Sequence, residues 1–238
     1  MEIGVIEAPT VRQLFMEKLI GMILSGELKP GERLPSERDL ASQARISKSA
    51  VHLAMTELER LRFVETRERH GTYVCDYART GTIETLNVLV GMQHGGFHDA
   101  AHMRDMLEMR IAIEGKALEL LCEKISLDDI ALLAGDVKKS QDCAARGDTH
   151  ALAVSFFDFH HDICFCSGNF ILPLLFNSFR TVTLSYWEYA IRELGTERCL
   201  WLLTDLFKLL KPNNAEAAIA FLKEEFDLYM KAAESHLQ

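Results

Sequence analysis

Residues 34–74 constrain the fold most, because two short helix patterns are followed there by a β-hairpin pattern. Ser36 precedes two acidic side chains and the apolar pair Leu40–Ala41, as the N-cap of a helix does, which predicts a helix over about 36–43. After a break at 44–46, Ser47 begins a second helix whose apolar positions recur at i, i+3, i+4 and i+7. Two short helices joined by such a turn predict a helix-turn-helix unit.

A hairpin follows this unit directly. Residues 63–67 have the composition of a strand, residues 68–71 that of a turn, and residues 72–74 that of a return strand. Gly71 is expected at positive φ, because glycine adopts that conformation without steric cost. The segment therefore predicts a winged helix-turn-helix.

The residues of this segment also match the sequence pattern of a known family. The pattern Leu34–Arg38 with Leu40 and Ala41, then Ile46, Ser47, Val51 and Leu58, then Gly71–Val74, resembles the winged helix-turn-helix of the GntR family of bacterial transcription regulators. The resemblance implies that double-stranded operator DNA is a partner and that a homodimer reads two half-sites. It assigns DNA contact to Arg38, Ser47, Lys48, Ser49, His52, Arg69, His70 and Gly71.

Three positions depart from the family pattern. Lys48 and His52 stand where the family usually has arginine, and Ala50 stands where it often has threonine. Lysine lacks the bidentate fork of arginine, and alanine can touch only a thymine methyl group. We therefore expect an operator that differs from the commonest half-site of the family.

Charge and length divide the chain into two domains. Residues 1–78 hold 11 basic and 12 acidic side chains, whereas residues 79–238 hold 15 and 23, within a formal net charge of −9. The acidic second domain is repelled by DNA phosphates, so DNA binding is expected to depend on the basic groups of the first domain. We predict a winged helix-turn-helix domain over 1–78 and an all-helical effector and dimerisation domain over 79–238.

The expected fold class is mostly α, with an antiparallel bundle of six or seven helices after the winged domain. An apolar stripe, Val11, Leu14, Phe15, Leu19, Ile20 and Ile23, predicts a helix ahead of the motif. Beyond it, helices are expected over 82–90, 99–123, 126–146, 149–167, 171–193, 197–210 and 215–236. No apolar run is long enough to cross a bilayer and no targeting signal is visible, so we expect a cytoplasmic protein without a membrane partner. The six cysteines are expected to be buried thiols.

The bundle resembles the FCD effector domain of the FadR-like GntR branch. Three stretches carry this resemblance: residues 106–114 with Arg110 and Glu114, residues 159–169 with His160, and residues 214–218. Many FCD domains hold a divalent metal, but Phe156 stands where the family has an aspartate, and the two later histidine positions fall on Leu203 and Glu225. Only His160 remains of the ligand set, so no cofactor is required and a divalent metal is not expected.

A degenerate metal site resembles the branch that binds a fatty acyl-CoA, which makes that ligand the preferred effector. The expected effector-binding residues are Arg110, Phe156, His160, Asn177, Arg180, Tyr186 and Trp187. The alternative in the same class is a small carboxylate, such as a sugar acid or organic acid, with Arg110 as its anion partner and possibly a metal. Arg110 and Glu114 can also form only an i, i+4 ion pair of small value.

Two other classes stay open. The run Asp158, His160, His161 and Asp162 could serve a metal-dependent enzyme, although a remote further ligand is not obvious. An architectural DNA-binding protein without an effector is disfavoured by so large an aromatic bundle. We expect a regulator and not an enzyme, while the operator, the regulated genes and the sign of regulation stay open.

Overall fold

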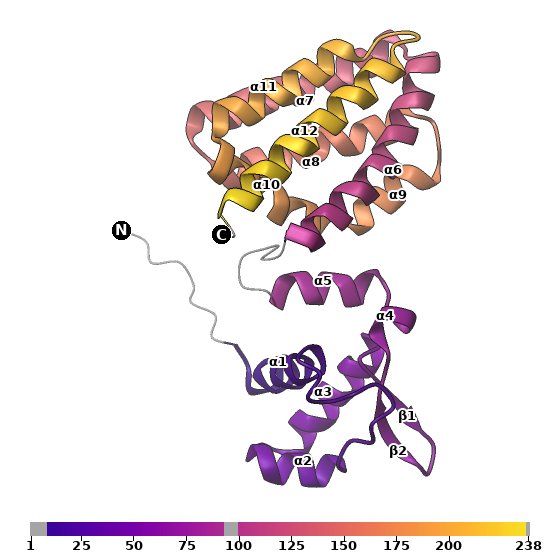
Figure 1. Cartoon of the computed structure of the whole chain (residues 1–238), viewed down its shortest axis with the longest axis vertical. Coiled ribbons are helices and arrows are strands. Elements are labelled where there is room, and N and C mark those ends of the chain that lie inside the picture. Colours follow the sequence, from indigo (N-terminus) through magenta and orange to yellow (C-terminus); the bar gives the residue numbers. More distant parts are fainter. Residues whose placement is uncertain (1–8, 93–99, 237–238) are drawn as a thin grey trace. The chain divides into compact units, whose positions relative to one another are not determined.

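The computed structural model describes residues 9–92 and 100–236, which belong to two compact units, Met1–Met92 and Gln93–Gln238 (Figure 1). The predicted fold class is confirmed: a helical unit with a two-stranded wing is followed by a unit whose secondary structure, within its described residues, consists of helices alone.

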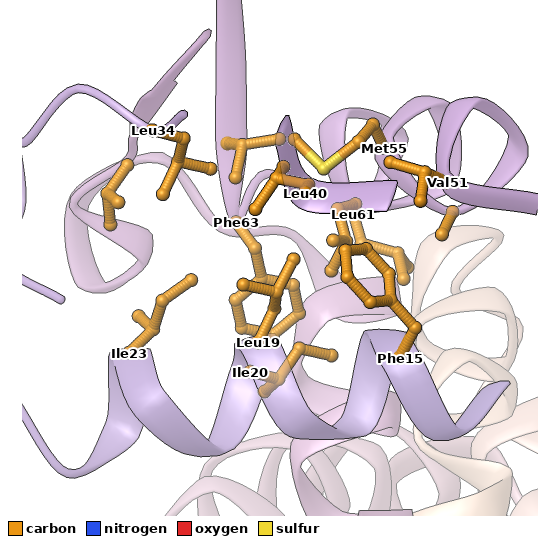
Figure 2. Packing of buried hydrophobic residues seen from close by; sticks show 14 residues of the cluster. Phe15, Leu19, Ile20, Ile23, Leu34, Leu40, Val51, Met55, Leu61 and Phe63 are labelled. Atoms are coloured by element: carbon orange, nitrogen blue, oxygen red, sulfur yellow. The ribbon is translucent and has the colours of Figure 1, made fainter. Parts of the chain in front are cut away.

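Helix α1 (Val11–Leu24) begins at a capping box, in which Thr10 Oγ1 accepts from the backbone N–H of Gln13 at 3.2 Å. Its buried residues are Phe15, Leu19, Ile20 and Ile23, which point into the core of the first unit (Figure 2). Two residues of the predicted apolar stripe do not belong to the core, because Val11 and Leu14 are 53% and 50% exposed.

The helix-turn-helix consists of α2 (Glu37–Ala44) and α3 (Lys48–Arg60). Ser36 Oγ accepts from the N–H of Asp39 at 3.3 Å, and Ser47 Oγ accepts from the N–H of Ala50 at 3.2 Å. Both predicted N-caps are therefore confirmed. Arg45 lies in the left-handed region at φ 55°, which turns the chain between the two helices.

The wing pairs β1 (Val64–Arg67) with β2 (Gly71–Val74) in antiparallel register, and Gly71 has the expected positive φ of 101°. A third segment, which the sequence analysis did not predict, extends the wing. The N–H of Leu34 donates to the Thr72 carbonyl at 2.9 Å, and the N–H of Val74 donates to the Glu32 carbonyl at 2.9 Å. The residues before α2 thus fix the base of the wing against the helices.

The core of the first unit joins Phe15 of α1, Val51 of α3 and Val64 of the wing. Leu34, Leu61 and Phe63 from the connecting segments belong to the same core (Figure 2). After the short α4 (Tyr77–Thr80), α5 (Ile83–Met92) also belongs to this unit, because Val88 and Leu89 pack against its core. The Thr85 hydroxyl, in addition, donates to the Leu61 carbonyl at 2.9 Å. The boundary between the units therefore lies after α5, whereas the sequence analysis placed it at residue 78.

The described residues of the second unit form α6 (Ala100–Lys124), α7 (Leu127–Arg146), α8 (Thr149–Cys166), α9 (Ile171–Ser178), α10 (Arg180–Leu194), α11 (Thr196–Leu209) and α12 (Ala215–His236). Helix α8 is the central element, since it packs against α6, α7, α9 and α10. Helices α6 and α12 lie side by side (Figure 1).

One predicted helix of the second unit is broken. The expected continuous helix over 171–193 is interrupted at Phe179 (φ −97°, ψ 12°), which separates α9 from α10. The Ser178 hydroxyl donates to the Leu174 carbonyl at 2.9 Å, and such bonds compete with regular helix geometry. The break lets Phe176 stay buried while Asn177 and Ser178 face solvent.

Within the described residues, no helix is long and apolar enough to span a membrane. The six cysteines are free and buried, as predicted. Burial raises the pKa of the Cys166 and Cys199 thiols to about 12, so these thiols are poor nucleophiles.

Candidate functional site

The first candidate site is the exposed surface of the helix-turn-helix. Helix α3 presents Lys48, Ser49 and His52 to solvent from its first two turns, and α2 presents Arg38. The first turn of the second helix is the part that enters a major groove in this motif. Neither Arg38 nor Lys48 has an ion-pair partner among the described residues, so both charges are available to a phosphate or a base edge.

His52 has a partner that the sequence analysis did not name. Its Nδ1 lies 3.0 Å from Oε1 of Glu37, which fixes the ring from the neighbouring helix. The ring remains 65% exposed. Glu37 therefore orients the histidine while Nε2 stays free for a DNA acceptor or donor.

The wing supplies the remaining expected contacts. Arg69 lies at its tip in a left-handed conformation, φ 62°, beside the exposed His70. Arg67 is already engaged, because Glu65 accepts from its Nε at 2.7 Å and its guanidinium lies 4.3 Å from the Tyr73 ring centroid. Arg69, at the tip of the wing, has no ion-pair partner among the described residues, so its charge is available to DNA.

The second candidate site is a buried polar cluster inside the second unit. Arg110 on α6 donates through Nε to Glu114 at 2.6 Å, and both side chains are 1% exposed. On α8, His160 Nδ1 lies 2.7 Å from the other oxygen of Glu114. One carboxylate thus joins two helices through two basic side chains.

Aromatic rings surround this cluster. Trp187 on α10 stacks on His160 with ring centroids 5.2 Å apart, and Phe156 contacts Trp187 edge-on at 5.2 Å. The Arg110 guanidinium lies 5.2 Å from the Tyr186 ring, 5.0 Å from Trp187 and 4.8 Å from Phe226. The cation is therefore held over π faces in a site from which water is excluded.

The acidic groups of the cluster titrate in opposite directions. Burial works against ionisation of Glu114, but the Arg110 charge and His160 outweigh it and lower the pKa of this carboxyl. Burial raises the pKa of Glu225 on α12, and nearby His160 and Arg110 offset this effect only in part. The pKa of the Glu225 carboxyl therefore lies above that of the Glu114 carboxyl.

Several polar atoms of this cluster are buried without a hydrogen-bond partner among the described residues. They are Arg110 Nη1 and Nη2, His160 Nε2, Thr183 Oγ1, Tyr186 Oη, Trp187 Nε1 and Glu225 Oε2. Buried polar groups are normally paired, and each unpaired one costs about 1–3 kcal/mol. Their concentration at one place in the bundle marks a site built to receive a polar ligand.

The structure brings together five of the seven expected effector residues: Arg110, Phe156, His160, Tyr186 and Trp187. Asn177 and Arg180 lie outside this cluster. Asn177 is exposed after the break in the predicted helix, and Arg180 pairs with Asp158 at 3.7 Å over the Phe157 ring.

The positions for a divalent metal do not fit one. Phe156 and Leu203 carry no donor atom, and within the described ranges no group of three or more His, Cys, Asp or Glu side chains could hold a metal. The neighbours of His160 in the chain are used elsewhere, since His161 pairs with Asp162 at 3.1 Å and Asp158 accepts from Lys139 at 2.6 Å.

The sequence pattern pointed to Glu225 only as a lost metal-ligand position, and Phe226 and Tyr229 were not expected in the cluster. Tyr229 donates to Glu225 at 3.1 Å, and both are 2% exposed. A signal was present, because Glu225 falls on the same helix face as Leu222 and Tyr229. An acid within an apolar stripe points to a buried charge.

A surface groove of about 580 Å³ between α6 and α12 lies beside the cluster. Phe226 lines this groove and also contacts Arg110, so its ring separates the groove from the buried guanidinium. The other lining residues are Arg104, Leu107, Glu108, Ile111, Lys223, Asp227, Met230 and Lys231.

An exposed helix-turn-helix with free cations and a separate bundle with a buried polar site define a ligand-responsive DNA-binding regulator. Residues 12–74 match the family described as bacterial regulatory proteins, gntR family, and residues 105–227 match the FCD domain. The chain belongs to the GntR family and carries an FCD effector domain. The family consists of transcription regulators, which confirms the prediction that the chain is not an enzyme.

Similar proteins are described as transcriptional regulators too. The HTH-type transcriptional regulator Mce2R of Mycobacterium tuberculosis is 30% identical over 72% of this chain and 69% of its own length. LutR of Bacillus subtilis, also described as an HTH-type transcriptional regulator, is 28% identical over 77% of each chain. Among solved structures, a chain described as Lar, which controls the Listeria monocytogenes agr system, superposes with a TM-score of 0.64 at 17% identity. The match covers 97% of this chain and 99% of that one, and it supports the fold.

Proposed function

We propose that this regulator is a homodimer that binds double-stranded operator DNA through α3 and the wing, and that a small carboxylate bound at Arg110 modulates its operator affinity. The ligand acts only through unequal affinity for the DNA-competent and DNA-incompetent arrangements of the dimer. We expect the protein to act in the cytoplasm, where its operator is.

The observation that carries this proposal is the state of Arg110. The side chain is fully buried, yet it uses only Nε, toward Glu114, and leaves Nη1 and Nη2 unpaired. A guanidinium presents these two donors as a fork that matches a carboxylate. A buried fork without a partner is costly, so a ligand carboxylate that fills it gains a strong charge-assisted bond.

The same geometry favours a small acid over the acyl-CoA that the resemblance suggested. The rings expected to line an acyl cavity contact one another, with Tyr186 and Trp187 5.2 Å apart and Tyr186 and Tyr229 5.1 Å apart. A long chain would have to separate these rings, whereas a small acid needs only the space beside the unpaired polar atoms. A response to acyl-CoA is therefore the competing outcome of the test below.

The groove between α6 and α12 offers the route to the site. Phe226 lines the groove and also contacts Arg110, so rotation of its ring would open a path from the groove to the guanidinium. Three of the groove residues, Arg104, Lys223 and Lys231, are basic and two are acidic, which leaves a positive balance suited to an anion.

Homodimerisation is supported by an exposed apolar patch at the end of α8 and on α9. Phe165 is 61% exposed, Phe170 79%, Ile171 56% and Leu174 53%. Patches of this kind on a soluble domain mark contacts with another protein. A second copy is the partner that a half-site reader needs.

Thermal unfolding of metal-stripped protein tests the effector. The panel contains small carboxylates, long-chain acyl-CoAs, free fatty acids and divalent metals. A ligand at a hundred times its Kd adds about 2.7 kcal/mol of stability. We expect stabilisation by a small carboxylate, loss of it in Arg110→Gln, and its retention in the exposed control Arg192→Gln. Stabilisation by acyl-CoA alone would replace the proposal with the acyl-CoA hypothesis.

A further inference from the structure

The buried cluster contains an arginine and a glutamate, Arg110 and Glu225, that do not touch each other. Arg110 and Glu225 are both fully buried and each feels the other's charge, yet no direct ion pair joins them in the described structure. Nη1 and Nη2 of Arg110 have no hydrogen-bond partner among the described residues, and Glu225 keeps Oε2 unpaired while Oε1 accepts from Tyr229. A buried guanidinium and a buried carboxyl that do not meet have lost their hydration without gaining each other as hydrogen-bond partners.

We propose that the effector is a small zwitterion, whose carboxylate binds Arg110 and whose protonated amine binds Glu225. The inference rests on the proposed function and specifies its ligand class. A molecule that carries both charges bridges the two unpaired groups at once, and it brings no net charge into the bundle. A plain carboxylate would satisfy Arg110 but would leave the Glu225 oxygen unpaired beside a second anion.

The surroundings suit an ammonium group at Glu225. Tyr229, which donates to Glu225, contacts the ring of Tyr186 at 5.1 Å and the ring of Trp187 at 5.8 Å. Aromatic faces attract cations when water is excluded. The unpaired Tyr186 hydroxyl and Trp187 indole N–H add hydrogen-bond capacity for the body of the ligand. An ammonium ion beside Glu225 also offsets the burial that raises the pKa of this carboxyl.

The departure from the family gives Glu225 a role. The sequence analysis placed Glu225 where many FCD domains have a metal-binding histidine, and Phe156 and Leu203 where they have two further ligands. With these donors absent, a ligand amine can occupy the positive position that a metal ion would hold. A carboxylate at residue 225 is the side chain that such an amine requires.

The test uses three matched panels on the full-length, metal-stripped chain: the standard L-amino acids, the corresponding 2-hydroxy acids, and the corresponding amines without a carboxylate. Thermal unfolding and isothermal titration calorimetry report binding. At least one amino acid is expected to bind at least tenfold more tightly than its hydroxy acid and its amine. Glu225→Gln, which keeps the shape and the acceptor for Tyr229, is expected to remove this preference. Glu224→Gln, its exposed neighbour on α12, is expected to retain it.

The outcomes separate the two proposals. Equal binding of hydroxy acid and amino acid overturns the zwitterion but keeps the carboxylate effector. Binding of neither class, or of acyl-CoA alone, overturns both. If Glu225→Gln does not fold, the selectivity of the unaltered protein between the panels still decides. If no amino acid binds although simple carboxylates do, Arg110 and Glu225 are bridged by water and the inference is wrong.

Discussion

Arg110 and Glu114 form an ion pair of 2.6 Å within α6, and both side chains are 1% exposed. The sequence allowed a surface pair of small value at this spacing, but the helix turns both residues into the bundle. The pair therefore lies at the centre of the polar cluster, and removal of one partner would leave a buried charge without its counterion.

Breaking this pair from one side should strongly destabilise the protein. Glu114→Gln leaves the Arg110 charge buried without its counterion, so we expect a loss of about 3–5 kcal/mol in the free energy of unfolding. Urea unfolding of the full chain measures it. Glu119→Gln on the same helix removes an exposed pair with Lys116, which lies at 2.8 Å, and should change stability by less than about 1 kcal/mol. Similar effects of the two substitutions would show that Glu114 is more hydrated than its burial indicates.

Asp136 should make stability depend on pH in the neutral range. Burial and the neighbouring Asp162 raise the pKa of Asp136 to about 7 from 3.8. Between these values the folded state holds a proton that the unfolded state has released, so the free energy of unfolding falls as pH rises from about 4 to about 7. Chemical denaturation across this range measures the slope. Asp136→Asn should flatten it, whereas the exposed control Asp142→Asn should leave it unchanged.

The DNA surface predicts a graded loss of operator binding. Substitution of Arg38, Lys48 or Arg69 by alanine should weaken the free energy of operator binding by about 1–3 kcal/mol if the side chain contacts a base. If the side chain contacts a phosphate, the slope of log K against log salt concentration should fall in magnitude by about 1. Fluorescence anisotropy on an operator selected from random DNA separates these cases. Arg79→Ala, a cation on α4 outside the helix-turn-helix, is the control. Selection that returns the usual consensus of the family would overturn the expected operator difference at Lys48, Ala50 and His52.

The contact between Glu37 and His52 gives a separate test of the recognition helix. Glu37→Gln weakens the 3.0 Å contact that orients the ring without altering His52 itself. If His52 reads DNA, operator affinity should change in Glu37→Gln and in His52→Ala, and the double variant should show non-additive losses. Additive losses would mean that Glu37 does not position the ring.

The sequence predicts those structural features that are determined by residues close to one another in the chain. The ends of α1, α7 and α12 were predicted to within a residue because caps, glycines and helical periodicity lie in the adjacent sequence. The helix-turn-helix was predicted for the same reason. The break at Phe179 was missed, because neither glycine nor proline marks it.

The polar cluster was predicted only in part. Arg110, His160 and Trp187 were expected to meet, and Glu225 was placed at a former metal-ligand position. Its burial as an acid was not expected, because a charged residue is ordinarily placed on the surface. The pairing of Glu32 and Leu34 with the wing was missed because it joins segments about forty residues apart, and no local pattern encodes such a contact.

The exposed apolar patch predicts the oligomeric state. Leu174→Asp places a charge among Phe170, Ile171 and Phe165, which should dissociate a dimer that is held through this face. Sedimentation equilibrium of the full chain measures the mass. Leu132→Asp, at an exposed leucine on α7, is the control. A variant that remains dimeric would move the interface elsewhere on the bundle.

Phe226 should control the rate at which the effector reaches Arg110. The ring lines the groove between α6 and α12 and lies 4.8 Å from the guanidinium, so Phe226→Ala connects the groove with the cluster. We expect faster association and faster dissociation, with a smaller change in Kd because the polar contacts remain. The cavity should also lower stability by about 3–5 kcal/mol. Stopped-flow measurement of the intrinsic tryptophan fluorescence follows binding, since Trp187 stacks on His160 within the cluster. Met230→Ala, which widens the groove without touching Arg110, separates the two effects. Unchanged rates in Phe226→Ala, with binding intact, would place the route to the site elsewhere in the bundle.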